Sequence, residues 1–168
     1  MTAHLKTMLT LIVLCAMLLF GVAWGWSAMT KPFPKKEAEK ACYPTQLQAG
    51  DRVSAPKVTV SVFNASERVG LADRTMAEFQ DQGFGTGEVG NAPKGTTVHY
   101  AQVWSNDPSD PDVRLVASRL GHHTHVVAKH HGGPGVIVMV GAHFQKLVPG
   151  RASVKVTKTT TICSPPTA

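Results

Sequence analysis

Hydrophobic and polar residues divide the chain into an apolar N-terminal segment and a longer part in which the two kinds alternate. Residues 8–29 contain no charged side chain, and Trp24 and Trp26 stand close to the end of this segment. A helix needs about 20 apolar residues to cross the hydrocarbon core of a membrane, and tryptophan rings favour the membrane–water interface. The pattern therefore predicts an N-terminal membrane anchor over residues 1–30.

A cleavable signal peptide is the alternative interpretation, with small residues near Gly25 or Ser27 as the cleavage site. The apolar run is longer than the usual hydrophobic region of a signal peptide, which favours the anchor. Lysines are more numerous on the C-terminal side of the segment, and this bias alone would keep the following part in the cytoplasm. Long folded segments, however, translocate largely regardless of charge. We expect a single-pass membrane protein whose C-terminal domain is extracytoplasmic.

Three cysteines bear on the compartment. Cys15 lies inside the apolar segment, whereas Cys42 and Cys163 stand near the two ends of the remainder. In an exported protein, Cys42 and Cys163 are the pair that can form an internal disulfide. Two exposed thiols or one intermolecular bond are the alternatives.

The segment after the anchor, residues 31–56, is polar and punctuated by prolines, which predicts a juxtamembrane stalk. Residues 58–63 then alternate valine with other residues at the period of a strand. A turn at residues 64–66 follows. Apolar residues next recur on one face of a helix that ends at a C-cap glycine; they are Val69, Ala72, Met76, Phe79 and Gly83.

The same order of elements repeats further along the chain. Residues 84–89 and 96–103 have the pattern of short strands. Asp110 and Pro111 suit the N-cap and the first position of a second helix. Residues 136–140, VIVMV, form a continuous apolar run, which predicts a central strand buried on both faces.

Together these elements predict an α/β (α+β) domain over residues 57–147. We expect a small βαβ-βαβ sandwich, with two helices on a mixed sheet of about four to five strands. Such a length is sufficient for one modest hydrophobic core. Residues 148–168 would form a C-terminal tail, in which residues 152–162 alternate weakly and could add an edge strand.

Several short motifs follow one another along this domain. The first strand ends in an Asn-containing turn, GLA opens the first helix, GF follows that helix, VGNA leads to the next strand, and GAHF follows the central strand; the residues are Asn64, 70–72, 83–84, 89–92 and 141–144. In their order and spacing these motifs resemble the LytR C-terminal domain family. His143 stands where that family usually has an acidic residue, and the family's first turn is often glycine-rich, whereas this one keeps only Gly70.

The resemblance implies an extracytoplasmic protein that supports the integrity of the cell envelope, without catalytic activity. A single copy of the domain behind one membrane segment, with paired cysteines outside it, is similar to actinobacterial envelope-integrity proteins. The implied partners are the membrane, through one N-terminal helix, and cell-wall polymers or other envelope proteins.

The turn between the first strand and the first helix is a candidate ligand-binding site. A helix N-terminus attracts anions, and this turn contributes Asn64, Ser66, Arg68 and Gly70. Trp104 is a further candidate because a tryptophan in a loop can stack on a sugar ring, although such a residue more often closes the end of a core. This turn, residues 64–70, has neither G-x-G-x-x-G nor G-x-x-x-x-G-K, so we do not expect it to bind a nucleotide.

Five of the eight histidines fall between His122 and His131. If this stretch is extended, His123 and His125 share one face and become weak candidates for metal ligands. A zinc site needs three or four ligands, and the stretch contains no cysteine or carboxylate. A solvated edge strand is therefore favoured. The alternative function is a metal- or ligand-dependent envelope enzyme that uses this cluster.

The net charge of the chain and its lack of common catalytic motifs limit the classes of function to consider. The chain has 17 Lys and Arg against 11 Asp and Glu, a formal net charge of +6. This excess favours anionic surroundings, such as lipid headgroups or phosphate-bearing wall polymers, but it is too small and scattered to indicate nucleic acid. The sequence has no G-x-S-x-G or H-E-x-x-H motif. We expect a membrane-anchored accessory protein that binds cell-wall components or envelope proteins, with no enzymatic activity and no cofactor.

Overall fold

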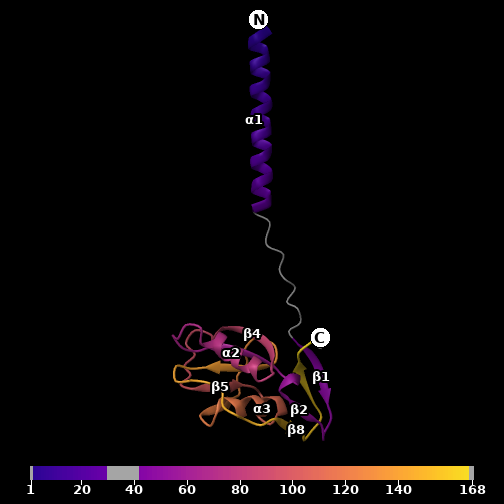
Figure 1. The fold of residues 1–168 in the computed structure, drawn as a ribbon, viewed down its shortest axis with the longest axis vertical. Coiled ribbons are helices and arrows are strands. Elements are labelled where there is room, and N and C mark those ends of the chain that lie inside the picture. The colour runs from indigo at the N-terminus through magenta and orange to yellow at the C-terminus, as the bar shows by residue number, and fades with distance from the viewer. Residues whose placement is uncertain (1, 30–41, 167–168) are drawn as a thin grey trace. The chain divides into compact units, whose positions relative to one another are not determined.

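The computed structural model describes residues 2–29 and 42–166, which belong to two compact units divided after residue 39 (Figure 1). The first unit consists of helix α1 (Thr2–Met29). Within α1, the 19 residues Met8–Trp26 are long and apolar enough to cross a membrane. At 1.5 Å per residue they span about 28 Å, close to the thickness of the hydrocarbon core. A signal sequence meets the same test, so both interpretations of this segment stay open.

The second unit is built on a five-stranded mixed sheet with the strand order β4-β3-β7-β5-β6. Strand β3 is parallel to both of its neighbours, β4 and β7, whereas β5 is antiparallel to β7 and parallel to β6. The strands are β3 (Thr59–Asn64), β4 (Gly85–Asn91), β5 (Ala101–Trp104), β6 (Thr124–Val127) and β7 (Val136–Val140). The predicted fold class, two helices on a mixed sheet, is confirmed.

Helices α2 (Leu71–Asp81) and α3 (Pro111–Leu120) pack their apolar sides against one face of the sheet (Figure 1). Their apolar residues join the sheet valines in one large core. Pro111 occupies the first turn of α3, as predicted, because its missing N–H has no helical partner there. Val69, which we placed on the buried face of the first helix, lies before α2 and is 95% exposed; that prediction is wrong.

The second face of the sheet carries a smaller cluster of Phe63, Val98, Trp104, Ile137 and Met139. Two loop residues, Ala65 and Ala92, pack against this cluster together with Val127 at the end of β6. The ring of His131, in the loop after β6, lies 4.3 Å from that of Phe63. Every residue of β7 is buried, as the apolar run predicts for a central strand.

The segments on either side of the predicted domain are folded as well. Residues 30–41 of the predicted stalk lie outside the described residues, but β1 (Tyr43–Leu47), β2 (Arg52–Ser54) and a 3-10 turn, η1 (Ala55–Lys57), occupy the rest of it. β1 pairs antiparallel with β9 (Thr160–Ser164), and β2 with β8 (Ser153–Lys155).

These pairs correct two of our expectations. The chain is folded from residue 43 onward, so the stalk prediction is wrong there, and the tail forms two separate strand pairs rather than an edge strand of the main sheet. Their inward side chains Leu47, Val53, Val154, Val156 and Ile162 belong to the large core. A disulfide joins Cys42 to Cys163 across the start of β1 and the end of β9, with Cα atoms 5.3 Å apart.

Candidate functional site: a polar crevice at the ends of two parallel strands

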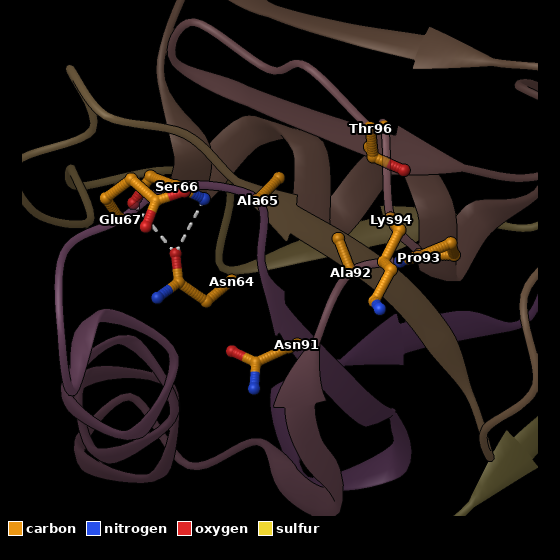
Figure 2. A pocket seen from close by; sticks show the side chains of 10 residues that line it. Asn64, Ala65, Ser66, Glu67, Asn91, Ala92, Pro93, Lys94 and Thr96 are labelled. Atoms are coloured by element: carbon orange, nitrogen blue, oxygen red, sulfur yellow. Dashed lines mark hydrogen bonds between the residues drawn. The ribbon is translucent and has the colours of Figure 1, made fainter.

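A polar crevice lies where the parallel strands β3 and β4 end. Asn64, the last residue of β3, is in register with Asn91, the last residue of β4. Helix α2, which connects these strands, begins on the same side, since parallel strands present their carboxyl ends at one edge of a sheet. The cavity has a volume of about 300 Å³ and is lined by residues 64–67 and 91–96 (Figure 2).

One wall of the crevice is a turn that its own side chains hold in place. The Oδ1 atom of Asn64 accepts hydrogen bonds from the backbone N–H and the hydroxyl of Ser66, at 2.9 and 2.8 Å (Figure 2). Its Nδ2 atom donates to the carbonyl of Arg68 at 2.6 Å. Asparagine stabilises such turns because its side chain imitates a backbone amide. The turn is therefore ordered without a ligand.

The opposite wall is formed by the end of β4 and the loop after it. The backbone N–H of Ala92 donates to the carbonyl of Asn64 at 2.9 Å, which joins the two walls. The Asn91 side chain is exposed and makes no hydrogen bond within the described residues. Figure 2 shows it beside Asn64, with Lys94 extending from the following loop. The amide of Asn91 and the ammonium of Lys94 are thus available to a ligand.

A smaller cavity of about 130 Å³ adjoins the crevice and shares Asn64 and Asn91 with it. Gly70 lines this cavity with a φ of +71°, a left-handed conformation that glycine adopts without steric cost. It is the N-cap residue of α2 and offers no side-chain cap. The start of the helix therefore faces open space rather than a capping side chain.

The candidate ligand residues fall into two groups. Asn64, Ser66 and Gly70 line the two adjoining cavities. Arg68 instead donates to the backbone carbonyls of Ala142 and Phe144, so its guanidinium holds the loop after β7. Their ligand-binding role stays a prediction.

Trp104 lies on the second face of the sheet and is only 7% exposed. Its indole Nε1 donates to the Gln102 side chain at 3.0 Å. The ammonium of Lys129 lies 5.2 Å from the centre of the Trp104 ring, and His131 meets the ring edge to face at 6.2 Å. Trp104 therefore closes the end of this smaller cluster and does not line the crevice.

The histidine-rich stretch does not form the extended segment that would align His123 with His125. His123 lies in a turn before β6, and its ring stacks on Tyr100 at 4.6 Å. His125 is an exposed residue of β6. Among residues 2–29 and 42–166, no group of three or more His, Cys, Asp or Glu side chains could hold a metal ion.

The acidic loop before α3 has a structural explanation. Asp107 accepts a hydrogen bond from Lys158 at 2.6 Å and two more from Ser109, and these lower the pKa of its carboxyl well below the usual range. Burial, together with the charge of Asp110, raises the pKa of Asp112 to about 6. The loop thus ties α3 to the segment before β9.

Sequence reasoning missed Asn91, Lys94 and Thr96 as lining residues of the crevice. The VGNAPKGT segment could have indicated them. It ends a strand that runs parallel to the first one, and parallel strands that are neighbours end at the same edge of the sheet.

Comparisons with known proteins identify the family of this domain. The family model described as "LytR cell envelope-related transcriptional attenuator", the LytR C-terminal domain, matches residues 57–144. Among solved structures, the soluble domain of a conserved hypothetical secreted protein from Mycobacterium marinum is similar, with 21% sequence identity and a TM-score of 0.47, over 62% of this chain and 79% of that one. No curated protein matches the chain. Since the family model covers just over half of the sequence, the chain belongs to the LytR C-terminal domain family.

Proposed function

We propose that this protein is a membrane-anchored, extracytoplasmic accessory protein that supports the integrity of the cell envelope by binding a cell-wall component. The family is described as cell envelope-related, and α1 contains a segment able to cross a membrane. The layout of one apolar helix, one domain and one disulfide resembles the actinobacterial envelope integrity protein Cei. No enzymatic step is part of the proposal, and the protein acts through its surface.

The observation that carries the proposal is the polar crevice at the ends of β3 and β4. Its Asn64 turn is held by three side-chain hydrogen bonds before any ligand arrives, so little ordering entropy is lost on binding. The free groups, an amide on Asn91 and an ammonium on Lys94, are hydrogen-bond donors. Glu67 lines the same crevice and carries the opposite charge to Lys94. Such a site suits a polar ligand with many hydroxyl and amide groups, as in a wall glycan with its peptides.

The test measures binding of the detergent-solubilised full-length protein to purified insoluble cell wall. The wild type should co-sediment with the wall. The Asn91→Ala and Lys94→Gln variants should bind about tenfold more weakly, since the first loses a hydrogen bond to the ligand and the second loses the charge that strengthens one. Lys155→Gln is the matched control, because Lys155 is an exposed residue of β8 outside the crevice. Equal binding by all four proteins would refute the crevice as the site.

A cellular experiment tests the role in the envelope. Deletion of the gene should increase sensitivity to wall-directed antibiotics, and the wild type and Lys155→Gln should restore resistance. The Asn91→Ala, Lys94→Gln double variant should not restore it, although its folding is intact. Full rescue by the double variant would contradict the proposal.

A further inference from the structure

A third cavity, of about 170 Å³, brings together aromatic, imidazole and ammonium side chains from three separate segments. Tyr100 precedes β5, His122 and His123 follow α3, and His143 and Lys146 follow β7. None of these residues lines the crevice at the ends of β3 and β4. The cavity is therefore a separate feature, and its function does not depend on the one proposed above.

The rings in this cavity lie close together. His123 is stacked on Tyr100, with centroids 4.6 Å apart and planes 20° from parallel. The ring centroids of His122 and His123 are 4.0 Å apart, and those of His143 and Tyr100 are 5.7 Å apart. Within the described residues, no hydrogen bond is formed by a side-chain nitrogen of His122, His123 or His143. These imidazole nitrogens are therefore available to a ligand.

Charged groups around the cavity are mainly positive. Lys146 lines it, His99 stacks on His143 at 6.1 Å, and the Arg68 guanidinium binds carbonyls on either side of His143. The acid packed against this loop is Glu78, whose carboxylate accepts a 2.7 Å hydrogen bond from the backbone N–H of Leu147. The cavity is thus lined by one ammonium group, a guanidinium group holds the loop that carries His143, and the carboxylate of Glu78 is engaged by a backbone N–H.

The floor of the cavity is apolar, with Leu120, Phe144 and Val148 among its lining residues. An apolar and aromatic surface next to cationic donors suits a ligand with two parts, one with a flat apolar face and one anionic. A pyranose ring has apolar C–H faces that pack on aromatic rings, and a phosphate accepts charge-assisted hydrogen bonds from imidazolium and ammonium groups.

We propose that this cavity binds a phosphorylated sugar, with the sugar ring against Tyr100 and the phosphate held by His122, His123, His143 and Lys146. Binding strengthens at mildly acidic pH. An imidazolium group donates a stronger, charge-assisted hydrogen bond to phosphate than a neutral imidazole does, and imidazolium is the form favoured by acid.

The test is isothermal titration calorimetry of the full-length protein in detergent, with glucose 6-phosphate as the probe. Glucose and inorganic phosphate serve as the two partial probes, at about pH 5.5 and about pH 7.5. Glucose 6-phosphate should bind more tightly than either partial probe, and about tenfold more tightly at the lower pH because bonds to charged donors are the stronger ones. Equal affinity at the two pH values, or equal affinity for inorganic phosphate, would overturn the proposal.

Variants distinguish this cavity from the rest of the surface. His123→Ala and Lys146→Gln should each weaken binding of glucose 6-phosphate about tenfold through loss of a charge-assisted bond. The Tyr100→Ala change should weaken glucose 6-phosphate but leave inorganic phosphate unchanged. His125→Ala is the matched control, since His125 is exposed on β6 outside the cavity, and Asn91→Ala reports on the crevice alone. Loss of binding in either of these two controls would refute the assignment, and thermal melting verifies that every variant is folded.

Discussion

The hydroxyl of Ser61 occupies the space directly in front of Gly87, on the neighbouring strand β4. It donates to the carbonyl of Pro134 at 2.6 Å and accepts the backbone N–H of Glu88 at 2.9 Å. One buried side chain in β3 therefore joins β4 to the loop that precedes β7. The neighbouring strand has room for this arrangement only because residue 87 has no side chain.

Replacement of Gly87 by alanine should destabilise the domain. A Cβ atom there would lie 2.8 Å from the carbonyl oxygen of Val60 and 3.0 Å from that of Pro134, as well as against Ser61. We expect a loss of roughly 1–3 kcal/mol in the free energy of unfolding, the usual cost of overpacking. Chemical denaturation monitored by circular dichroism measures it. Gly132→Ala is the control, since a Cβ at Gly132 meets nothing within 4 Å; equal stability of the two variants would disprove the explanation.

Loss of the disulfide should lower stability without abolishing the fold. The bridge closes a loop with a sequence separation of 121, and the chain-entropy model gives about 4–5 kcal/mol for a loop of that length. Cys163→Ser should therefore lower the melting temperature, while the main core, which does not involve the bridge, remains. Non-reducing mass spectrometry of the wild type should show one bridge between Cys42 and Cys163. Two alkylatable thiols in the native protein would be inconsistent with it.

Asp112 should make stability depend on pH. Its folded pKa is about 6 against an ordinary value of 3.8, so the folded state binds a proton more tightly than the unfolded state does. The free energy of unfolding therefore falls as pH rises from about 4 to 6 and stays lower above that range. Asp112→Asn should stabilise the protein at neutral pH by roughly 1–3 kcal/mol and flatten this part of the profile.

Melting temperatures between pH 4 and pH 7 measure the effect. The asparagine keeps the Oδ1 acceptor for the backbone N–H of Val113, so a difference between the variants reflects charge rather than a lost hydrogen bond. Identical profiles for the wild type and Asp112→Asn would show that the carboxyl is well solvated.

The membrane topology is open to a direct test. A periplasm-active reporter fused after Ala168 should be active, and a reporter that functions only in the cytoplasm should be inactive, because we place the domain outside the membrane. The opposite pattern would refute the extracytoplasmic location. It would also place the cysteines in a reducing compartment, where a disulfide does not persist.

Elements with strong local signals could be predicted from sequence. The run VIVMV predicts the bounds of β7 correctly, because a continuous apolar run suits a strand that is buried on both faces. Pro111 predicts the start of α3 correctly, because the fixed φ of proline suits the first turn of a helix. Strands β1, β2, β8 and β9 were not predicted as pairs. They have three to five residues each, and they pair with partners about a hundred residues away. Strands this short show too few alternating positions for their pattern to be recognised, and no local pattern identifies a distant pairing partner.

The same distinction applies to the candidate sites. Asn64 and Ser66 could be identified because an asparagine turn uses residues adjacent in sequence. Asn91 joins them only through the register of two parallel strands. The meeting of Tyr100 with His123 and His143 likewise depends on how the loops at one end of the sheet converge, which no local pattern specifies.

The bridge between Cys42 and Cys163 also determines how the domain carries mechanical load. A tensile force that reaches β1 from its N-terminal side passes through Cys42, the residue directly before that strand. The covalent bond passes that force at once to β9 as well as to β1, so β1 cannot be peeled from its partner beginning at that end. In an envelope under turgor, a domain tethered at one end and bound at another would therefore resist being unravelled strand by strand.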